Sequence, residues 1–172
     1  IMLFITNSVP YVAVAILLFL WFSGKKNQTL DRRRTDIYAA LSSLMALFVN
    51  SMIHLVYYHP RPFVAHHVHL LVHHAADSSF VSDHAVLVFA IAWTLLMRNE
   101  RIKYPIFIWA TIVAISRIYI GVHYPADVIG SALIAFGTSM LLVYFSKKWE
   151  PLVQIIFRLY DLVTKRFMSV FR

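Results

Sequence analysis

The stretch "VAVAILLFLWF", residues 12–22, contains no charged side chain and no polar face at helical spacing. The stretch "YPIFIWATIVAI", residues 104–115, has the same character. A helix on the surface of a soluble bundle needs polar residues on the side that faces water, whereas a helix in lipid does not. Both stretches therefore predict helices that cross a membrane, and they argue against a soluble helical bundle.

The composition extends this prediction to the whole chain of 172 residues, of which 60% are hydrophobic and only 14% charged. The mean hydropathy is +0.68, and this balance is far from that of ordinary soluble domains. A spanning helix needs about 20 mostly apolar residues. The candidate segments are 1–22, 36–56, 80–97, 104–120 and 126–145. We therefore predict an all-α, polytopic transmembrane helical bundle of about five spans, with its core over residues 1–145.

The basic residues predict how this bundle is oriented, because short cytoplasmic loops collect Lys and Arg. Of the 16 Lys and Arg residues, all but Arg61 and Arg117 lie in "SGKKNQTLDRRRTD", in "RNERIK" or after residue 145. These places fall on one side of the predicted spans. We therefore predict an N-terminus outside and a C-terminus in the cytoplasm, and the net charge of +8 then requires no nucleic-acid partner.

The two ends of the chain carry separate expectations. In the tail, residues 146–172, apolar residues recur at helical intervals between basic ones. This pattern is typical of an amphipathic helix on the cytoplasmic membrane surface, with a dimerisation helix as the alternative. The chain begins with Ile1, so we expect that a short upstream segment or a signal peptide is missing. The absence of cysteine excludes disulfides and thiolate metal ligands.

Arg61, in "YYHPRPF", and Arg117, in "SRIYIGVHYPAD", both lie at predicted outer ends of spans. An unpaired cation there is costly, so an anionic partner is expected. Between them, "SSFVSDHAVLVFA" predicts a helix with Ser82 as its N-cap, and a helix start binds anions through its free N–H groups. Phosphate fits this set. The alternatives are that the arginines extend to the membrane interface or pair with Asp77, Asp83 or Asp127.

His123 and Asp127 are four residues apart, and Pro125 is expected at the first position of the last span. At this spacing the Asp127 carboxylate would reach back to one ring nitrogen of His123 and fix its tautomer. The other nitrogen would then be free as a nucleophile or base. A hydrogen-bonded structural histidine is the alternative, and the joint occurrence of all these groups on one membrane face favours chemistry.

With these residues the chain resembles the membrane branch of the type 2 phosphatidic acid phosphatase family. The third motif of that family is Ser-Arg, five residues, His, three residues, Asp. It is present in full at Ser116, Arg117, His123 and Asp127.

The other two family motifs are present with substitutions. The second, usually Pro-Ser-Gly-His, keeps Ser82 and His84 in "VSDH". The first, usually Lys, six residues, Arg-Pro, keeps Arg61 and has His54 at the lysine position. The aspartate at Asp83 and the missing lysine make the chain similar to the BcrC-type undecaprenyl pyrophosphate phosphatases, which are associated with bacitracin resistance.

This resemblance implies phosphoryl transfer in two steps through a phosphohistidine, without a metal ion or other cofactor. It implies that His123 attacks the phosphorus, that Asp127 orients His123, and that His84 protonates the leaving oxygen. His54 is an auxiliary candidate. The implied phosphate-binding residues are Arg61, Arg117, Ser82, Asp83 and Ser116.

For the subgroup, the implied reaction is hydrolysis of undecaprenyl diphosphate to undecaprenyl phosphate and phosphate. It would take place at the extracytoplasmic face of a bacterial cell membrane and would recycle the cell-wall lipid carrier. The expected partners are a polyprenyl diphosphate and membrane lipids, and the oligomeric state is open.

Three alternatives remain at this stage. The first is a phosphatidate or phosphatidylglycerol phosphate phosphatase of the same fold, and the second is a noncatalytic lipid-diphosphate binder or transporter. The third is a zinc or copper protein that uses a histidine-rich segment. The histidines concerned are His59, His66, His67, His69, His73 and His74.

Overall fold

The computed structural model describes residues 1–23, 29–66, 68, 75 and 77–170, with the backbone alone at 165–170. Within this part of the chain all regular structure is helical, which confirms the all-α prediction. The helices are α1 (Met2–Phe22), α2 (Thr29–Val56), α3 (Pro62–Ala65), α4 (Asp83–Met97), α5 (Lys103–Tyr119), α6 (Pro125–Tyr144) and α7 (Ser146–Val170).

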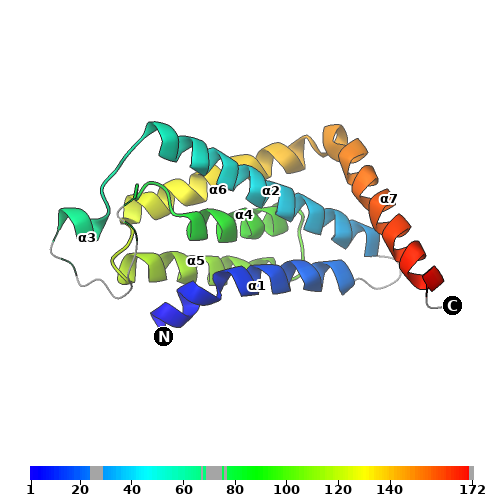
Figure 1. The fold of residues 1–172 in the computed structure, drawn as a ribbon, viewed down its shortest axis with the longest axis horizontal. Coiled ribbons are helices and arrows are strands. Elements are labelled where there is room, and N and C mark those ends of the chain that lie inside the picture. The colour runs from blue at the N-terminus through cyan, green and yellow to red at the C-terminus, as the bar shows by residue number, and fades with distance from the viewer. Residues whose placement is uncertain (24–28, 67, 69–74, 76, 171–172) are drawn as a thin grey trace.

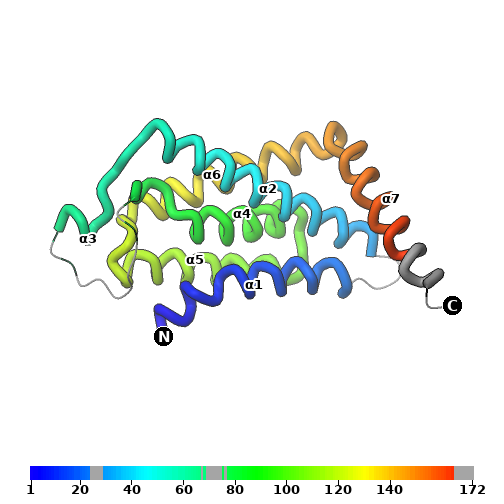
Figure 2. Tube along the Cα trace, in the orientation of Figure 1, coloured from blue at the N-terminus to red at the C-terminus, as the bar shows by residue number. Residues whose placement is uncertain are grey.

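The helices α1, α2, α4, α5 and α6 run side by side along the long axis of the molecule (Figure 1). α4 packs against α2, α5 and α6, while α1 packs against α2 and α5. Successive helices of this bundle run in opposite directions (Figure 2), so α2 and α5 end where α4 and α6 begin. α3 lies at this end of the bundle and α7 at the other.

Small residues and buried hydroxyl groups let α4 lie within the bundle. The buried alanines of one hydrophobic cluster around α4 are Ala46, Ala85, Ala90, Ala92, Ala110, Ala114 and Ala135. Thr94 Oγ1 of α4 lies 3.1 Å from Ser42 Oγ of α2 and 3.2 Å from Ser139 Oγ of α6. Small side chains allow close helix contact and hydroxyl groups link helices where water is absent, as in membrane bundles.

Three of the described helices, α1, α2 and α6, are long and apolar enough to cross a membrane. α4 has 15 residues and α5 has 17, fewer than the roughly 20 that a span needs. α4 begins later than the predicted segment 80–97 because Ser82 caps it and the residues before it are not helical. The prediction of five spans and their orientation stays a prediction.

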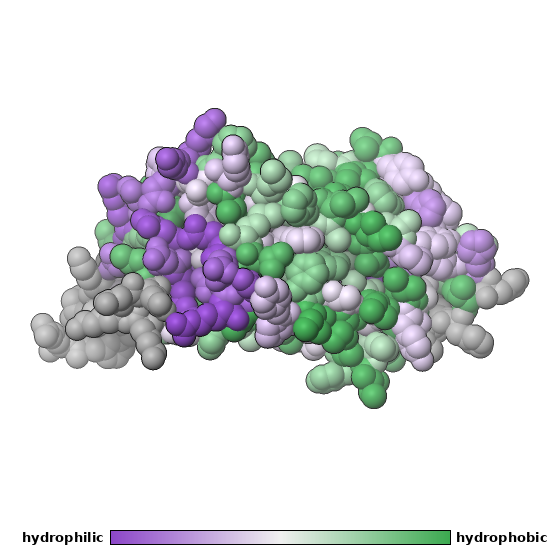
Figure 3. Space-filling model, turned by 180° about the vertical axis from the view of Figure 1, so that it is seen from behind, coloured by the Kyte–Doolittle hydropathy of each residue, from purple (hydrophilic) through white to green (hydrophobic). Residues whose placement is uncertain are grey.

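The outer surface of the bundle is apolar along its middle. Exposed side chains there include Leu18, Phe48, Ile108, Leu133 and Phe136. Figure 3 shows apolar residues over the middle of the molecule and hydrophilic residues gathered at the end where α7 lies. An apolar band next to a charged end is what a protein in a lipid bilayer presents, so the chain is a membrane protein.

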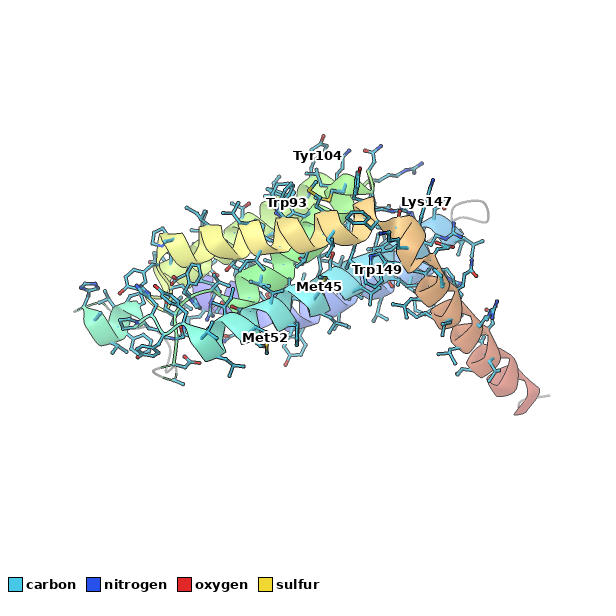
Figure 4. All side chains as sticks on the ribbon, turned by 90° about the horizontal axis from the view of Figure 1, so that it is seen from above. Met45, Met52, Trp93, Tyr104, Lys147 and Trp149 are labelled. Carbon is cyan, nitrogen blue, oxygen red and sulfur yellow. The ribbon has the colours of Figure 1, made fainter. Side chains whose placement is uncertain are left out.

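The tail forms α7, which leaves the bundle at an angle (Figure 4). Trp149 lies on the side of α7 that faces α2, near Met45, and Phe157 packs near Trp21 of α1. The tail is therefore helical and joined to the bundle, while its position on a membrane surface stays a prediction. Several basic residues used to predict the orientation lie outside the described side chains: Lys25, Lys26, Lys165, Arg166 and Arg172.

Candidate active site

Hydrogen bonds connect the start of α4 to the first turns of α6. Ser82 is the N-cap of α4, as predicted, and its Oγ accepts a hydrogen bond from the Ala85 backbone N–H at 3.5 Å. The Ser82 N–H donates to Ser131 Oγ of α6 at 3.0 Å. The Ser131 hydroxyl lies 2.7 Å from the carbonyl oxygen of Asp127. These hydrogen bonds hold Ser82 of the second family motif next to Asp127, the last residue of the third motif.

A tight turn between α5 and α6 holds His123. α5 ends at Tyr119, and Gly121 adopts a φ of 81°, a conformation that favours glycine. α6 begins at Pro125, as predicted, and the Tyr124 N–H donates to Asp127 Oδ2 at 2.8 Å. The side chain of His123 is thus confined between these helices and only 4% of the residue is exposed.

The two ring nitrogens of His123 have different surroundings. Nδ1 lies 2.8 Å from the Ser79 carbonyl oxygen and 3.6 Å from Asp127 Oδ2, and both of these groups only accept. The neutral ring therefore carries its proton on Nδ1. Nε2 is then an acceptor, and it faces Arg61 Nη1 at 3.2 Å. The sequence predicted that Asp127 would bind a ring nitrogen of His123. In the structure the Ser79 carbonyl oxygen lies closer to Nδ1 than the Asp127 carboxylate does.

Burial lowers the pKa of His123 below its ordinary value, because the charged ring loses its water. The nearby Asp127 carboxylate acts in the opposite direction, and the charges of Arg117 and Arg61 lower the pKa further. The ring is therefore held neutral, with an unprotonated Nε2, which is the form that can attack phosphorus.

Ser79 is a site residue that sequence reasoning missed. It is fully buried, its hydroxyl donates to Asp127 Oδ2, and its carbonyl accepts from His123. It thus bridges the predicted nucleophile and the predicted orienting carboxylate. The signal available in the sequence was its place in "ADSSFVSDH", three residues before Ser82, but nothing there distinguishes it from Ser78.

Arg61 is buried and makes contacts on both sides of its guanidinium. Its Nη1 donates to the Val122 carbonyl at 3.0 Å, next to His123. Its Nε donates to Asp77 Oδ1 at 2.8 Å. The pairing of Arg61 with Asp77, which the sequence left open, is thus formed, and the same guanidinium still faces the imidazole of His123.

Arg117 is as deeply buried as Arg61, with 4% of the residue exposed. Unlike Arg61, it has no carboxylate partner among the described residues. Its Nη1 donates to Thr6 Oγ1 of α1 at 2.8 Å, and its Nε is buried without a hydrogen-bond partner. Among the residues that the structure describes, no carboxylate forms an ion pair with Arg117. A buried guanidinium in this condition is a donor available to an anionic ligand.

The remaining predicted residues lie around this centre. Ser116 Oγ donates to the Val113 carbonyl of its own helix at 2.6 Å. Asp83 is exposed and accepts from Asn50 Nδ2 at 2.6 Å. His54 Nε2 lies 3.3 Å from the Val81 carbonyl, and His84 is half-buried in the first turn of α4.

Asn50 of α2, a second residue missed in the sequence, holds the segment before α4. Its Nδ2 donates to the Val81 carbonyl at 3.2 Å, and its Oδ1 accepts from the Val81 N–H at 3.3 Å. A proline has no N–H to donate. The replacement of the family's usual proline by Val81 therefore adds a contact that fixes this segment to α2.

A cavity of about 370 Å³ lies beside His123. Its lining includes His66, Ile118, Tyr119, His123 and Tyr124. A polar end at the imidazole and an apolar wall on α5 suit a ligand that has a phosphate head and a hydrocarbon chain.

The described residues contain no group of three or more His, Asp or Glu side chains placed to hold a metal ion. Four histidines of the metal hypothesis lie outside the described residues: His67, His69, His73 and His74. That hypothesis is therefore untested by the structure.

Comparison with known proteins shows which family the chain is similar to and which fold it shares. Residues 35–151 match the family described as the PAP2 superfamily. The chain is 39% identical to undecaprenyl-diphosphatase BcrC of Bacillus subtilis, over 96% of this chain and 84% of that protein. It is 27% identical to the bacitracin transport permease protein BcrC of Bacillus licheniformis, over 95% and 78%. The crystal structure of Aquifex aeolicus LpxE superposes with a TM-score of 0.66 at 26% identity, over 83% and 85%.

Proposed function

Because this chain belongs to the PAP2 superfamily, we propose that it hydrolyses undecaprenyl diphosphate to undecaprenyl phosphate and inorganic phosphate. The observation that carries the chemistry is the buried His123, whose Nδ1 lies 2.8 Å from the Ser79 carbonyl oxygen and whose Nε2 faces Arg61 at 3.2 Å. The choice of substrate is supported by the similarity to undecaprenyl-diphosphatase BcrC over nearly the whole chain.

In the first step, Nε2 of His123 attacks the terminal phosphorus and the bond to the bridging oxygen breaks. His84 gives a proton to that oxygen, so undecaprenyl phosphate leaves. The phosphorylated ring keeps its Nδ1 proton, and its positive charge is stabilised by the Ser79 carbonyl and the Asp127 carboxylate, whose Oδ2 lies 3.6 Å away. This charge stabilisation in a buried site lowers the barrier.

In the second step, water attacks the phosphorus of the phosphohistidine. His84, now neutral, takes a proton from the water, and the phosphorus–nitrogen bond breaks. Inorganic phosphate is released, and His123 returns to its neutral form with the proton on Nδ1. The same histidine thus acts as acid and then as base.

The phosphate oxygens are held by Arg61, Arg117 and the N–H groups at the start of α4 behind Ser82. Arg117 supplies a guanidinium that has no carboxylate partner among the described residues. The Ser116 hydroxyl already binds the Val113 carbonyl of its own helix, and Asp83 binds Asn50 of α2. We therefore assign Ser116 to a structural role within α5, and Asp83 to the contact between α4 and α2. His54 is assigned to the same task through the Val81 carbonyl.

We further propose that α1, α2, α4, α5 and α6 span a bacterial cell membrane, with this site at the extracytoplasmic face and α7 on the cytoplasmic surface. Hydrophilic residues gather at the α7 end (Figure 3), and most Lys and Arg residues of the sequence lie in the connections and the tail at that end. This distribution supports the proposed orientation. The lipid tail stays in the bilayer while the diphosphate reaches His123. The product returns to cell-wall synthesis as lipid carrier, and removal of the diphosphate form confers bacitracin resistance.

The test of this function is phosphate release by the purified protein in detergent. Undecaprenyl diphosphate, phosphatidate and phosphatidylglycerol phosphate are compared at equal surface concentration. We expect the highest kcat/KM with the diphosphate. Preference for either phospholipid would reassign the substrate, and binding of the diphosphate without release would favour a binder or transporter, as the name of the Bacillus licheniformis relative suggests for that protein.

A further inference from the structure

α1 lies outside the residues that match the family, 35–151, yet it contributes a buried hydroxyl to the candidate site. Thr6 is 1% exposed, and its Oγ1 accepts from Arg117 Nη1 at 2.8 Å. α1 packs along α5, which carries Arg117 (Figure 1). We infer that Thr6 is a positioning residue, which fixes the Arg117 guanidinium in the orientation that receives the terminal phosphate.

The chemistry of this contact suits an arginine that must bind an anion. A guanidinium has five N–H donors, and on Arg117 one is used by Thr6 while the buried Nε is unpartnered. A hydroxyl is a neutral acceptor, so it fixes the side chain without cancelling its charge. A carboxylate in the same place would compete with the phosphate for the guanidinium.

The other site arginine shows the contrast. Arg61 is paired with the Asp77 carboxylate at 2.8 Å and with the Val122 carbonyl at 3.0 Å. Arg117 has no ion pair within the described part of the chain, so it supplies the less compensated charge. Its orientation depends on Thr6, because no other described side chain binds its guanidinium.

This inference rests on the proposed function, so the test measures turnover of undecaprenyl diphosphate. Thr6→Val keeps the shape of the side chain and removes the hydroxyl, whereas Thr6→Ser keeps the hydroxyl. Ser8→Ala is the matched control on α1, because the Ser8 hydroxyl donates to the carbonyl of its own helix at Ile5. Each variant is compared for kcat, KM, melting temperature and inhibition by orthovanadate, a probe of the phosphate site.

We expect Thr6→Val to lower kcat/KM by about tenfold, since hydrogen bonds to charged groups are among the stronger ones. Orthovanadate inhibition weakens in parallel, while the melting temperature stays that of the wild type. Thr6→Ser and Ser8→Ala stay within about twofold of the wild type.

Two results would overturn the inference while leaving the proposed function intact. One is wild-type turnover and orthovanadate inhibition by Thr6→Val. The other is an equal loss of activity in Thr6→Val and Thr6→Ser together with a lower melting temperature, which is the behaviour of a packing residue. A wild-type protein that releases no phosphate from any of the three lipids refutes the proposed function, and this inference with it.

Discussion

At the scale of single residues, the proposed phosphoryl transfer requires a neutral His123. Burial lowers its pKa from the ordinary 6.5. A ring with a lowered pKa keeps Nε2 unprotonated to more acidic pH, so the nucleophilic form persists below that value. We expect the acid limb of kcat/KM against pH to fall below pH 6.5. An acid limb above this value, in a protein that stays folded over the range, contradicts the assignment.

Ser79 allows a second test at this scale. Ser79→Ala removes the hydroxyl bound to Asp127 and keeps the carbonyl that binds His123. We expect kcat to fall roughly thirtyfold, since a hydrogen bond to a charged group contributes about 2 kcal/mol. The control is Ser78→Ala, because the Ser78 hydroxyl contacts the backbone of His59 and Tyr57 instead. Equal losses in the two variants would show that Ser79 has no special connection to catalysis.

At the scale of helices, the contact between α6 and the segment before α4 is close. A Cβ added at Gly130 would lie 2.9 Å from Phe80 Cε2 and 3.0 Å from Val81 Cγ1. Gly130→Ala therefore displaces the segment that carries Ser79 and Ser82. We expect a destabilisation of about 1–3 kcal/mol, measured as a lower melting temperature, together with a lower kcat.

The matched control for this prediction is Gly137→Ala on the same helix, where an added Cβ meets nothing within 4 Å. Alanine favours the helix over glycine by about 0.5–1 kcal/mol, so this variant keeps its activity and melts at the same temperature or higher. If Gly130→Ala behaves like Gly137→Ala, the close packing between α6 and the segment before α4 is not required.

The sequence predicted the helices of the bundle and the Ser82 and Pro125 boundaries, because apolar runs and helix-start residues are local signals. The third motif also predicted that His123 and Asp127 would lie together. Asn50 and Thr6 were missed, because their partners Val81 and Arg117 are distant in sequence.

The surroundings of His123 differ from those predicted from the sequence. The nearest acceptor of Nδ1 is the Ser79 carbonyl, a backbone group that every residue carries. Residue type therefore gives no signal for it. The sequence identified the charged members of the site, and the neutral groups that position them became visible only in the fold.

At the scale of the whole molecule, the orientation in the membrane is directly testable. The chain has no cysteine, so single cysteines can be introduced at Tyr58, near the candidate site, and at Asn99, between α4 and α5; both positions are exposed. With a membrane-impermeant maleimide, we expect Tyr58→Cys to be labelled in intact spheroplasts and Asn99→Cys only after permeabilisation. The reverse pattern would place the site in the cytoplasm.

The proposed phosphohistidine can be detected most directly by transfer of radiolabelled terminal phosphate from undecaprenyl diphosphate to the protein, in the presence of EDTA. An alkaline quench preserves a phosphohistidine. We expect the label on His123. In the His123→Ala variant, shown to elute and melt as the wild type does, we expect neither label nor phosphate release. Phosphate release by His123→Ala at the wild-type rate, or loss of wild-type release in EDTA, would contradict the proposed mechanism.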